Sequence, residues 1–231
     1  MHVFITGISG GLGLALAHEF LAKGAIVTGI GRTNSINHPN YSFLNCDLSD
    51  LTQVVCLDLG KIDQDAILIN NAGIIGNIQR LSDQEHPDVE AVMNINALAP
   101  MLLSAKFMRS TSSDIAATIV NISSGAARRA IPSWASYCAS KAAIDRFSET
   151  FYFEEKEKGR KIRVYAVAPG VIDTNMQTTI RTTNAVDFSS IERFKDLKST
   201  NSLKSPQATA AEIYQLVTQA KFDESAIICS L

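Results

Sequence analysis

The chain has 231 residues, of which 46% are hydrophobic and 19% charged, enough for one sizeable core. Its net charge of −2, from 21 basic and 23 acidic residues, excludes the basic footprint of a nucleic-acid-binding protein. No apolar run reaches the roughly 18 residues of a membrane helix, and because "MHVFITG" runs straight into a glycine motif we expect no signal peptide. The four cysteines lack metal-ligand spacing and are expected to be reduced thiols of a cytoplasmic protein.

Apolar and β-branched runs alternate along the chain with longer helical patterns. The runs lack polar alternation, as is typical of strands buried on both faces of a parallel sheet, and they cover 2–6, 25–30, 41–45, 66–70, 117–123, 162–168 and 225–230. Helical patterns cover 11–23, 50–59, 87–109, 134–158 and 207–220. This order predicts one α/β domain over 1–231, a Rossmann fold with a doubly wound parallel sheet of about seven strands and helices on both faces.

The segment 171–205 departs from this alternation. Thr and Asn interrupt it, and its apolar positions, such as Phe188, Ile191 and Phe194, are isolated. A stretch of this length without a clear element is usually a lid or a disordered segment. We expect one or two short helices that form a substrate-binding lid over a site.

A glycine-rich turn, "TGISGGLG" (6–13), joins the first strand to the first helix. Gly7, Gly11 and Gly13 would allow a tight turn, the approach of a diphosphate to backbone amides, and close packing of helix on strand. The helix N-terminus adds a favourable dipole for phosphates. Any strand–helix junction can use glycines, but this position after the first strand favours a dinucleotide site.

The end of the second strand bears on the choice of cofactor. NAD-binding folds of this type place an acidic residue there, whereas "VTGIGRTNS" (27–35) has none and the next acid is Asp47. Arg32 and Thr33 stand where a 2′-phosphate would lie, and a guanidinium suits bidentate phosphate contact. The alternative is an exposed loop charge. We predict NADP(H) as the cofactor.

Tyr137 and Lys141 in "WASYCASK" (134–141) lie four residues apart and therefore share one face of a predicted helix. An ammonium beside a phenol would lower its pKa from about 10, which suits proton transfer near neutral pH. The small residues between them would leave room for a nicotinamide and a carbonyl. The alternative is a solvent-facing pair on an amphipathic helix.

Seven motifs, in their order and approximate spacing, resemble the short-chain dehydrogenase/reductase superfamily over nearly the full chain: "TGISGGLG", "CDLSD" (46–50), "NNAG" (70–73), "NINALAP" (94–100), "IVNISS" (119–124), "YCASK" (137–141) and "APGVIDT" (168–174). The resemblance implies that Ser124 hydrogen-bonds a substrate carbonyl and that Tyr137 gives it a proton. It also implies that Lys141 holds the nicotinamide ribose and tunes Tyr137, while Asn96 holds a water that links Lys141 to solvent. Ser123 competes with Ser124 for the first role, but the spacing to Tyr137 favours Ser124.

The resemblance also implies a set of cofactor contacts. Asp47 would face the adenine, "NNAG" would back the ribose, and the residues after "PG" would contact the carboxamide and the diphosphate. The implied cofactor-binding residues are Gly7, Ser9, Gly11, Leu12, Gly13, Arg32, Thr33, Asp47, Leu48, Asn71, Ala72, Gly73, Tyr137, Lys141, Pro169, Gly170, Ile172 and Thr174.

These residues predict an NADPH-dependent carbonyl reductase in which Tyr137 is the general acid toward a small ketone or aldehyde. The stretches 169–177 and 194–203 resemble the sepiapterin reductase and benzil reductase branch, which implies a diketone or pterin-like substrate. Asn175 replaces the aspartate expected in that branch and argues against a pterin. The alternatives are a 3-oxoacyl-carrier-protein reductase, an alcohol dehydrogenase, or a silent cofactor-sensing protein.

The helix at 134–153 carries two apolar groups, which together exceed the roughly 100° stripe that one core requires. One comprises Ala135, Cys138, Ala139, Ala142 and Phe153, and the other Ala143, Ile144, Phe147 and Phe151. We predict that one group covers the sheet and the other a second copy, in a homodimer or homotetramer; coverage by the helix's own neighbours is the alternative. The four histidines match no motif, and no metal site is expected.

Overall fold

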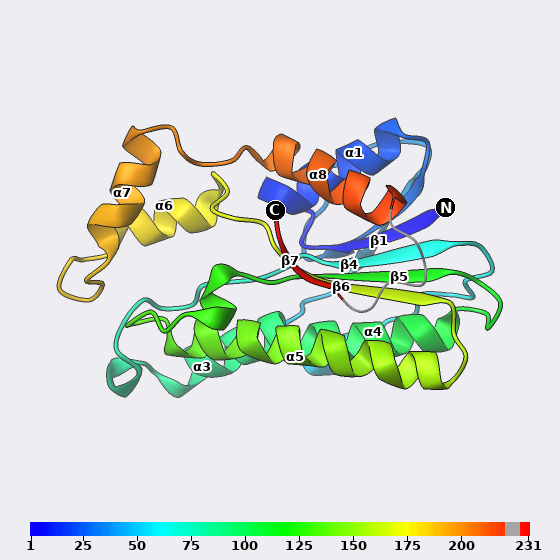
Figure 1. Ribbon diagram of the computed structural model, residues 1–231, viewed down its shortest axis with the longest axis horizontal. Helices are drawn as coiled ribbons and strands as arrows, with labels where there is room; N and C mark the ends of the chain where they lie inside the picture. Colours follow the sequence, from blue (N-terminus) through cyan, green and yellow to red (C-terminus); the bar gives the residue numbers. More distant parts are fainter. Residues whose placement is uncertain (220–226) are drawn as a thin grey trace.

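The computed structural model describes residues 1–219 and 227–231 and contains one seven-stranded parallel sheet (Figure 1). Its order is β3-β2-β1-β4-β5-β6-β7, which confirms the predicted doubly wound Rossmann fold in a single domain. The strands are β1 (His2–Thr6), β2 (Ile26–Gly31), β3 (Tyr41–Asn45), β4 (Ala66–Asn70), β5 (Ala117–Ile122), β6 (Ile162–Ala168) and β7 (Ile227–Ser230). Of the predicted last strand, 225–226 lie outside the described residues, as does residue 220 of the last helix.

Helices cover both faces of the sheet (Figure 1). On one face lie α1 (Gly11–Ala22) and α8 (Pro206–Gln219). On the other lie α2 (Leu51–Cys56), α3 (His86–Met93), α4 (Ala99–Ser110) and α5 (Ala135–Glu157). Short 3-10 turns, η1 (Leu81–Asp83) and η3 (Gly125–Arg128), follow β4 and β5.

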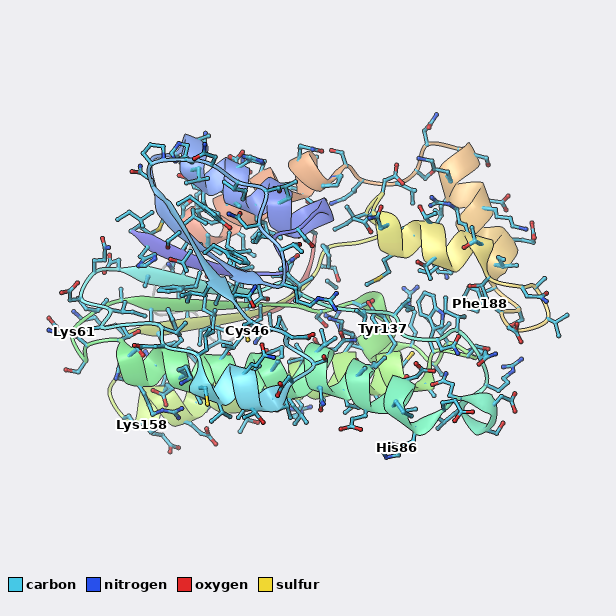
Figure 2. All side chains as sticks on the ribbon, turned by 180° about the vertical axis from the view of Figure 1, so that it is seen from behind. Cys46, Lys61, His86, Tyr137, Lys158 and Phe188 are labelled. Atoms are coloured by element: carbon cyan, nitrogen blue, oxygen red, sulfur yellow. The ribbon has the colours of Figure 1, made fainter. Side chains whose placement is uncertain are left out.

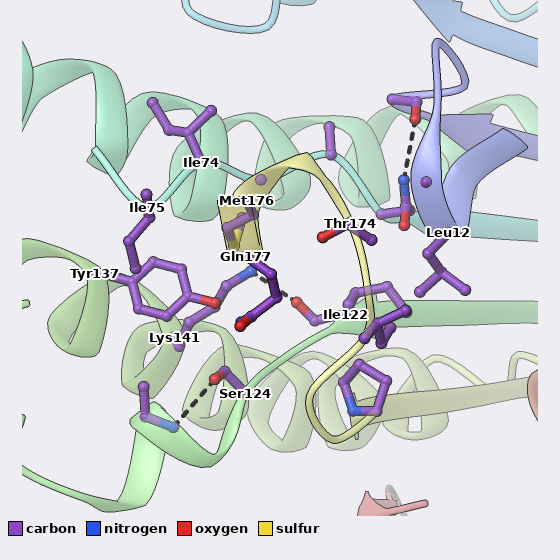
Figure 3. Close-up of a pocket in the computed structure, with 18 of the residues that line it drawn as sticks. Leu12, Ile74, Ile75, Ile122, Ser124, Tyr137, Lys141, Thr174, Met176 and Gln177 are labelled. Carbon is purple, nitrogen blue, oxygen red and sulfur yellow. Dashed lines mark hydrogen bonds between the residues drawn. The ribbon is translucent and has the colours of Figure 1, made fainter. Parts of the chain in front are cut away.

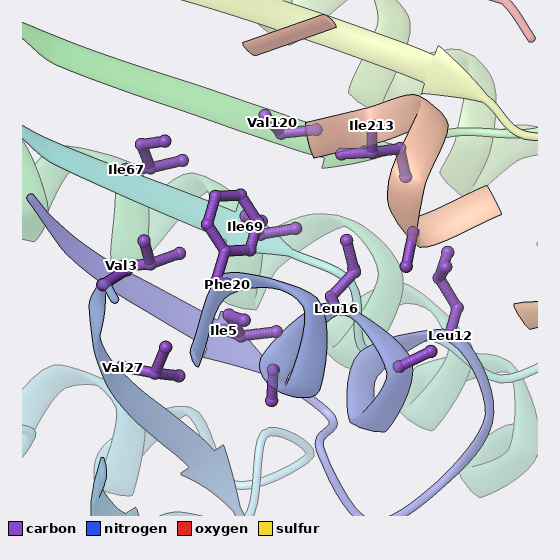
Figure 4. Close-up of a cluster of buried hydrophobic side chains, with 14 of the residues drawn as sticks. Val3, Ile5, Leu12, Leu16, Phe20, Val27, Ile67, Ile69, Val120 and Ile213 are labelled. Atoms are coloured by element: carbon purple, nitrogen blue, oxygen red, sulfur yellow. The ribbon is translucent and has the colours of Figure 1, made fainter. Parts of the chain in front are cut away.

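Successive residues of the central strands enter two different cores, because side chains alternate across a sheet. Val3 and Ile5 of β1 pack against α1 and α8, whereas Phe4 faces the cluster beneath α4 and α5. In the first cluster, Leu16 and Phe20 of α1 lie over the strands (Figure 4). Burial on both faces explains why the strands read as continuous apolar runs.

Two predicted helices differ from the structure. The single helix expected at 87–109 is interrupted by a π-helical turn, η2 (Asn94–Leu98), between α3 and α4. This wider turn carries Asn96, whose side-chain amide bonds both backbone groups of Ile74, so tertiary hydrogen bonds offset the irregular helix. The helix expected at 50–59 ends at Cys56, because Leu57 leaves in an extended conformation and is buried in the core.

The segment 171–205 forms two short helices, α6 (Asn175–Thr182) and α7 (Ile191–Ser199), at the end of the sheet where the strands finish (Figure 1). Figure 2 shows Tyr137 and Phe188 where this segment meets the body of the fold. Trp134, at the start of α5, stacks on Phe188 with ring centroids 5.2 Å apart and lies 5.4 Å from Phe194. Aromatic contacts therefore join the segment to α5.

One helical stretch, His86–Ser110, is long and apolar enough to pass for a membrane span by length and composition. Half of its 18-residue apolar window is buried inside the fold, as in the core helix of a soluble protein. Leu103 and Phe107 belong to the core beneath the sheet.

Candidate active site

A cavity of about 1110 Å³ opens at the carboxyl edge of the sheet, over the ends of β1, β4, β5 and β6. This is the edge at which open α/β sheets present their ligand sites. The cavity runs from the glycine turn to the segment 171–205. Its volume lies at the upper end for small-molecule sites, so it can hold a dinucleotide and a small substrate together.

The glycine turn shapes the first end of this cavity. Gly7 has φ +74°, and a Cβ there would lie 2.9 Å from the Ala72 Cα. A Cβ on Gly13 would overlap the Gly7 carbonyl oxygen, so Gly13 allows α1 to approach β1 rather than lining the cavity. The N-terminus of α1 therefore faces an open cradle that suits a diphosphate.

The end of β4 is fixed against the same turn. The Asn71 amide nitrogen Nδ2 donates to the Thr6 carbonyl at 2.9 Å and to the Gly7 carbonyl at 3.2 Å. The Thr6 hydroxyl accepts from the backbone N–H groups of Asn71 and Ala72, each at 3.0 Å. These bonds hold two predicted cofactor motifs at one wall of the cavity.

Arg32 and Asp47 line the cavity beyond the turn. The Arg32 side chain is 77% exposed, and its guanidinium lies 3.9 Å from the Asp47 carboxylate. The backbone N–H and hydroxyl of Ser49 donate to that carboxylate and, with Arg32, hold the pKa of Asp47 below its usual range. Asp47 is therefore an anion near the position predicted for a phosphate.

Tyr137 and Lys141 of α5 meet Ser124, which follows β5, in the middle of the cavity (Figure 3). Tyr137 is 7% exposed and Lys141 4%, so the solvent-facing alternative is wrong. The Lys141 ammonium donates to the Ile122 carbonyl at 2.8 Å and lies 5.8 Å from the centre of the Tyr137 ring. One phenol, one hydroxyl and one ammonium thus meet at the wall of the same cavity.

The expected lowering of the Tyr137 pKa is not what the structure shows. Burial raises the pKa of the Tyr137 phenol, and the nearby Ser124 hydroxyl lowers it by less. Burial also lowers the Lys141 pKa to about 8, which the Asp145 charge partly opposes. Desolvation is the largest influence on both pKa values, because burial disfavours the charged form of each group.

The two neighbouring serines point to different partners. The Ser123 hydroxyl donates to the buried Asp145 carboxylate, which lies 3.5 Å from the Arg128 guanidinium. The Ser124 hydroxyl accepts from the Ala126 backbone N–H at 3.1 Å and lies at the cavity beside Tyr137 (Figure 3). Ser124 is therefore the serine with the geometry to meet a carbonyl.

Asn96 lies behind the cavity wall and is buried. Its amide nitrogen donates to the Ile74 carbonyl at 2.8 Å and the Ser140 hydroxyl at 3.1 Å, and its Oδ1 accepts from the Ile74 N–H. A Cβ on Gly73 would lie 3.3 Å from Asn96 Oδ1 and 3.4 Å from Lys141 Nζ. Asn96 and Lys141 are thus close neighbours on either side of Gly73.

Most of the predicted site residues are brought together. Apart from Gly13 and Asn96, all of them line the cavity: Gly7, Ser9, Gly11, Leu12, Arg32, Thr33, Asp47, Leu48, Asn71, Ala72, Gly73, Ser124, Tyr137, Lys141, Pro169, Gly170, Ile172 and Thr174.

The cavity wall opposite the glycine turn contains residues that the sequence analysis did not predict as site residues. It includes Trp134, Met176, Ile180 and Phe194, which form an apolar chamber next to Tyr137. Gln177 also lines the cavity, 7% exposed, and its Oε1 is buried without a hydrogen-bond partner among the described residues. A sequence signal existed, since Gln177 shares the buried face of α6 with Ile180, three residues on.

Comparisons with known proteins agree with this geometry. The family model for short chain dehydrogenase matches residues 1–185. A benzil reductase ((S)-benzoin forming) from Bacillus subtilis is 38% identical, covering 92% of this chain and 91% of its own, and one from Bacillus cereus is 33% identical, covering 98% of both. A solved short chain dehydrogenase/reductase from Saccharomyces cerevisiae superposes with TM-score 0.83 at 23% identity, covering 96% of this chain and 92% of its own.

These matches confirm the resemblance to short-chain dehydrogenases/reductases that the motifs indicated. They also confirm the sepiapterin reductase and benzil reductase branch, because a sepiapterin reductase from Xenopus tropicalis is 36% identical over 126 residues. That match covers 53% of this chain and 47% of the sepiapterin reductase. The matched region contains the glycine turn, the tyrosine and the lysine. The chain therefore belongs to the short chain dehydrogenase family of oxidoreductases.

Proposed function

We propose that this protein is an NADPH-dependent carbonyl reductase that reduces aromatic ketones, with 1,2-diketones such as benzil as its best substrates. The observation that carries the proposal is the meeting of Ser124, Tyr137 and Lys141 in one cavity that joins a phosphate cradle to an aromatic chamber. The benzil reductases that the chain resembles support the choice of substrate.

The residues present fit a nicotinamide dinucleotide. The cavity beside Gly10, where a Cβ would meet nothing within 4 Å, and the N-terminus of α1 suit its diphosphate, and Asn71, Ala72 and Gly73 would back a ribose. When bound, the cofactor supplies the hydride for the carbonyl carbon. Ile172 and Thr174 would contact its carboxamide and its diphosphate, and Thr174 lies against Gly11 of the glycine turn.

The preference for NADPH rests on Arg32 and Thr33. An exposed guanidinium at the cavity rim can bind a 2′-phosphate, and β2 ends without the carboxylate that would repel one. Arg32 faces Asp47 at 3.9 Å, so the phosphate would compete with that weak surface pair. We therefore expect clear but incomplete selectivity over NADH.

In the proposed mechanism, the carbonyl oxygen lies between Ser124 and Tyr137. The Ser124 hydroxyl donates a hydrogen bond that orients and polarises the carbonyl, and Tyr137 delivers a proton to the oxygen as the carbon is reduced. The Lys141 ammonium stabilises the phenolate that Tyr137 becomes, and it would also hold the nicotinamide ribose. Asn96 would position the water through which Lys141 exchanges protons with solvent.

The segment 171–205 is proposed to act as a lid. Phe188 and Phe194 hold it against Trp134 beside the chamber, while Lys198 pairs with Asp173 at 2.6 Å and joins α7 to the loop before α6. Such a cover would exclude water from the hydride-transfer site.

The experiment that tests the function follows NADPH absorbance with benzil, diacetyl, sepiapterin and an acetoacetyl thioester. We expect kcat/KM to be highest for benzil and low for sepiapterin, because the chamber is apolar and Asn175 replaces the aspartate of the pterin enzymes. Best activity with the thioester would instead identify a 3-oxoacyl reductase. Binding of NADPH with no turnover of any carbonyl would refute the proposed enzyme.

We further propose a cytoplasmic homodimer or homotetramer that uses α5. Ala135, Ala139, Ala142 and Phe153 are exposed on one side of that helix, with Phe153 58% exposed, whereas Ile144 is buried and Phe151 belongs to the core beneath the sheet. One of the two apolar groups therefore remains uncovered by the chain's own described neighbours.

A further inference from the structure

The Gln177 side chain is a polar group in an apolar wall. It extends from α6 across the cavity toward Tyr137 and Ser124 (Figure 3). Its oxygen is buried without a partner, and its nitrogen makes no hydrogen bond with any residue that the structure describes. Leaving a buried amide unpaired is costly, so such a group indicates a missing partner.

The neighbours of Gln177 offer a donor to its oxygen but leave its nitrogen free. Ile180 lies on the same face of α6, and Met176 and Phe194 belong to the surrounding apolar cluster. The Arg181 guanidinium, one turn further on, contacts Thr178 and Asp173 through Nη2, while its Nη1 is buried without a partner among the described residues and is therefore a donor for the Gln177 oxygen on the same helix. No described residue hydrogen-bonds the Gln177 nitrogen, so that donor is available to a molecule in the cavity.

The chemistry of an amide selects the kind of molecule. A half-turn of its last side-chain bond presents either the oxygen or the nitrogen, so the group can offer an N–H donor. In the proposed mechanism, Ser124 and Tyr137 already donate to the reacting carbonyl oxygen of a substrate. A further N–H donor across the cavity would bind a second carbonyl oxygen, on the carbon next to the reacting one.

We propose that Gln177 is the residue that selects 1,2-dicarbonyl substrates, by donating a hydrogen bond to the non-reacting carbonyl oxygen. This inference rests on the proposed function and specifies how its site recognises the preferred substrate. Gln177 orients the dicarbonyl so that one oxygen faces Tyr137 and the other faces α6. A monoketone of the same shape leaves the amide unpaired.

The test compares benzil with deoxybenzoin, in which a methylene group replaces the second carbonyl. Benzil is intrinsically more electrophilic, so the informative quantity is the change in the ratio of the two kcat/KM values on mutation. Gln177→Met keeps the length and helix propensity of the side chain but removes the amide. Thr179→Ala, at an exposed position two residues further along α6, is the matched control.

In Gln177→Met we expect the benzil-to-deoxybenzoin ratio to fall about tenfold, the equivalent of one hydrogen bond at about 1.4 kcal/mol per tenfold change. The KM for NADPH should stay unchanged, and Thr179→Ala should leave the ratio at its wild-type value. Gln177→Leu provides a second apolar variant if the methionine protein folds poorly, as judged by its melting temperature.

Three results would overturn the inference. An equal loss for both ketones would show that Gln177 has a structural or general catalytic role. A raised KM for NADPH at an unchanged ratio would show that it contacts the cofactor. Failure of the wild-type protein to reduce either ketone would instead refute the proposed function on which the inference rests.

Discussion

Lys141 allows a quantitative prediction, because its burial links stability to pH. The ammonium is 4% exposed, and its pKa falls from an ordinary 10.5 to about 8. Charging it in the folded protein is therefore harder than in the unfolded chain, by about 3 kcal/mol at neutral pH. The unfolded state binds more protons between pH 8 and 10.5, so the free energy of unfolding should rise with pH across that window.

The perturbation is Lys141→Met, which keeps the length of the side chain and removes its charge. Relative to this variant, the wild type should gain about 2 kcal/mol of unfolding free energy between about pH 7 and pH 9.5. Urea titrations of both proteins at equal concentration measure the difference between their unfolding free energies at each pH. The titration of other groups affects both proteins alike and cancels in this difference. Lys61→Met, the same change at an exposed lysine, is the control and should track the wild type.

A difference between wild type and Lys141→Met that stays constant from pH 7 to 9.5 would refute the reasoning. It would mean that Lys141 is solvated or fully paired in the folded protein, and that burial does not control its charge. A difference that shrinks with rising pH, in the direction opposite to the expected one, would indicate a net stabilising ammonium, as a strong pair with Asp145 would produce.

Four further predictions follow from the site. Tyr137→Phe should keep NADPH affinity, measured by fluorescence titration, and lose about 10²–10⁴-fold or more in kcat; turnover at the wild-type rate would remove Tyr137 from the mechanism. Arg32→Asp should shift the kcat/KM preference from NADPH toward NADH, and equal use of NADH by the wild type would contradict the assignment. Gly13→Ala should lower both the melting temperature and cofactor affinity because its Cβ meets the Gly7 carbonyl, whereas Gly10→Ala, with nothing within 4 Å of its Cβ, should leave the melting temperature unchanged. Light scattering should show a species larger than 25 kDa that Phe153→Glu reduces, and a wild-type monomer would contradict the proposed use of α5.

The sheet could be predicted because its signals are local. Apolar runs such as 66–70 and 162–168 are long enough to be recognised as buried strands. The glycine turn and the helical patterns between such runs indicate that strands and helices alternate. The π-helical turn at Asn94–Leu98 could not, because it depends on hydrogen bonds between Asn96 and Ile74, twenty-two residues earlier. The helix propensities of residues 94–98 cannot predict such a long-range hydrogen bond.

In the candidate site, too, the features set by local sequence could be predicted, and those set by tertiary contacts could not. Its motifs place Tyr137 and Lys141 four residues apart, and that spacing requires only a helix. Their pKa values depend on how deeply the fold buries them, which is set by contacts with parts of the chain distant in sequence. The position of Gln177 likewise depends on how α6 folds back over the cavity, in a segment whose sequence has little periodicity.

Trp134 is the chain's one tryptophan, and it forms part of the cavity wall. Its ring stacks on Phe188, stands edge-on to Tyr137 and lies tilted against Phe194, so that it contacts the segment proposed as a lid. Indole emission from this protein therefore arises at the substrate chamber alone, undiluted by signal from any other site. The native chain thus carries its own optical reporter, so that stopped-flow fluorescence without any attached dye can test whether the segment proposed as a lid moves during turnover.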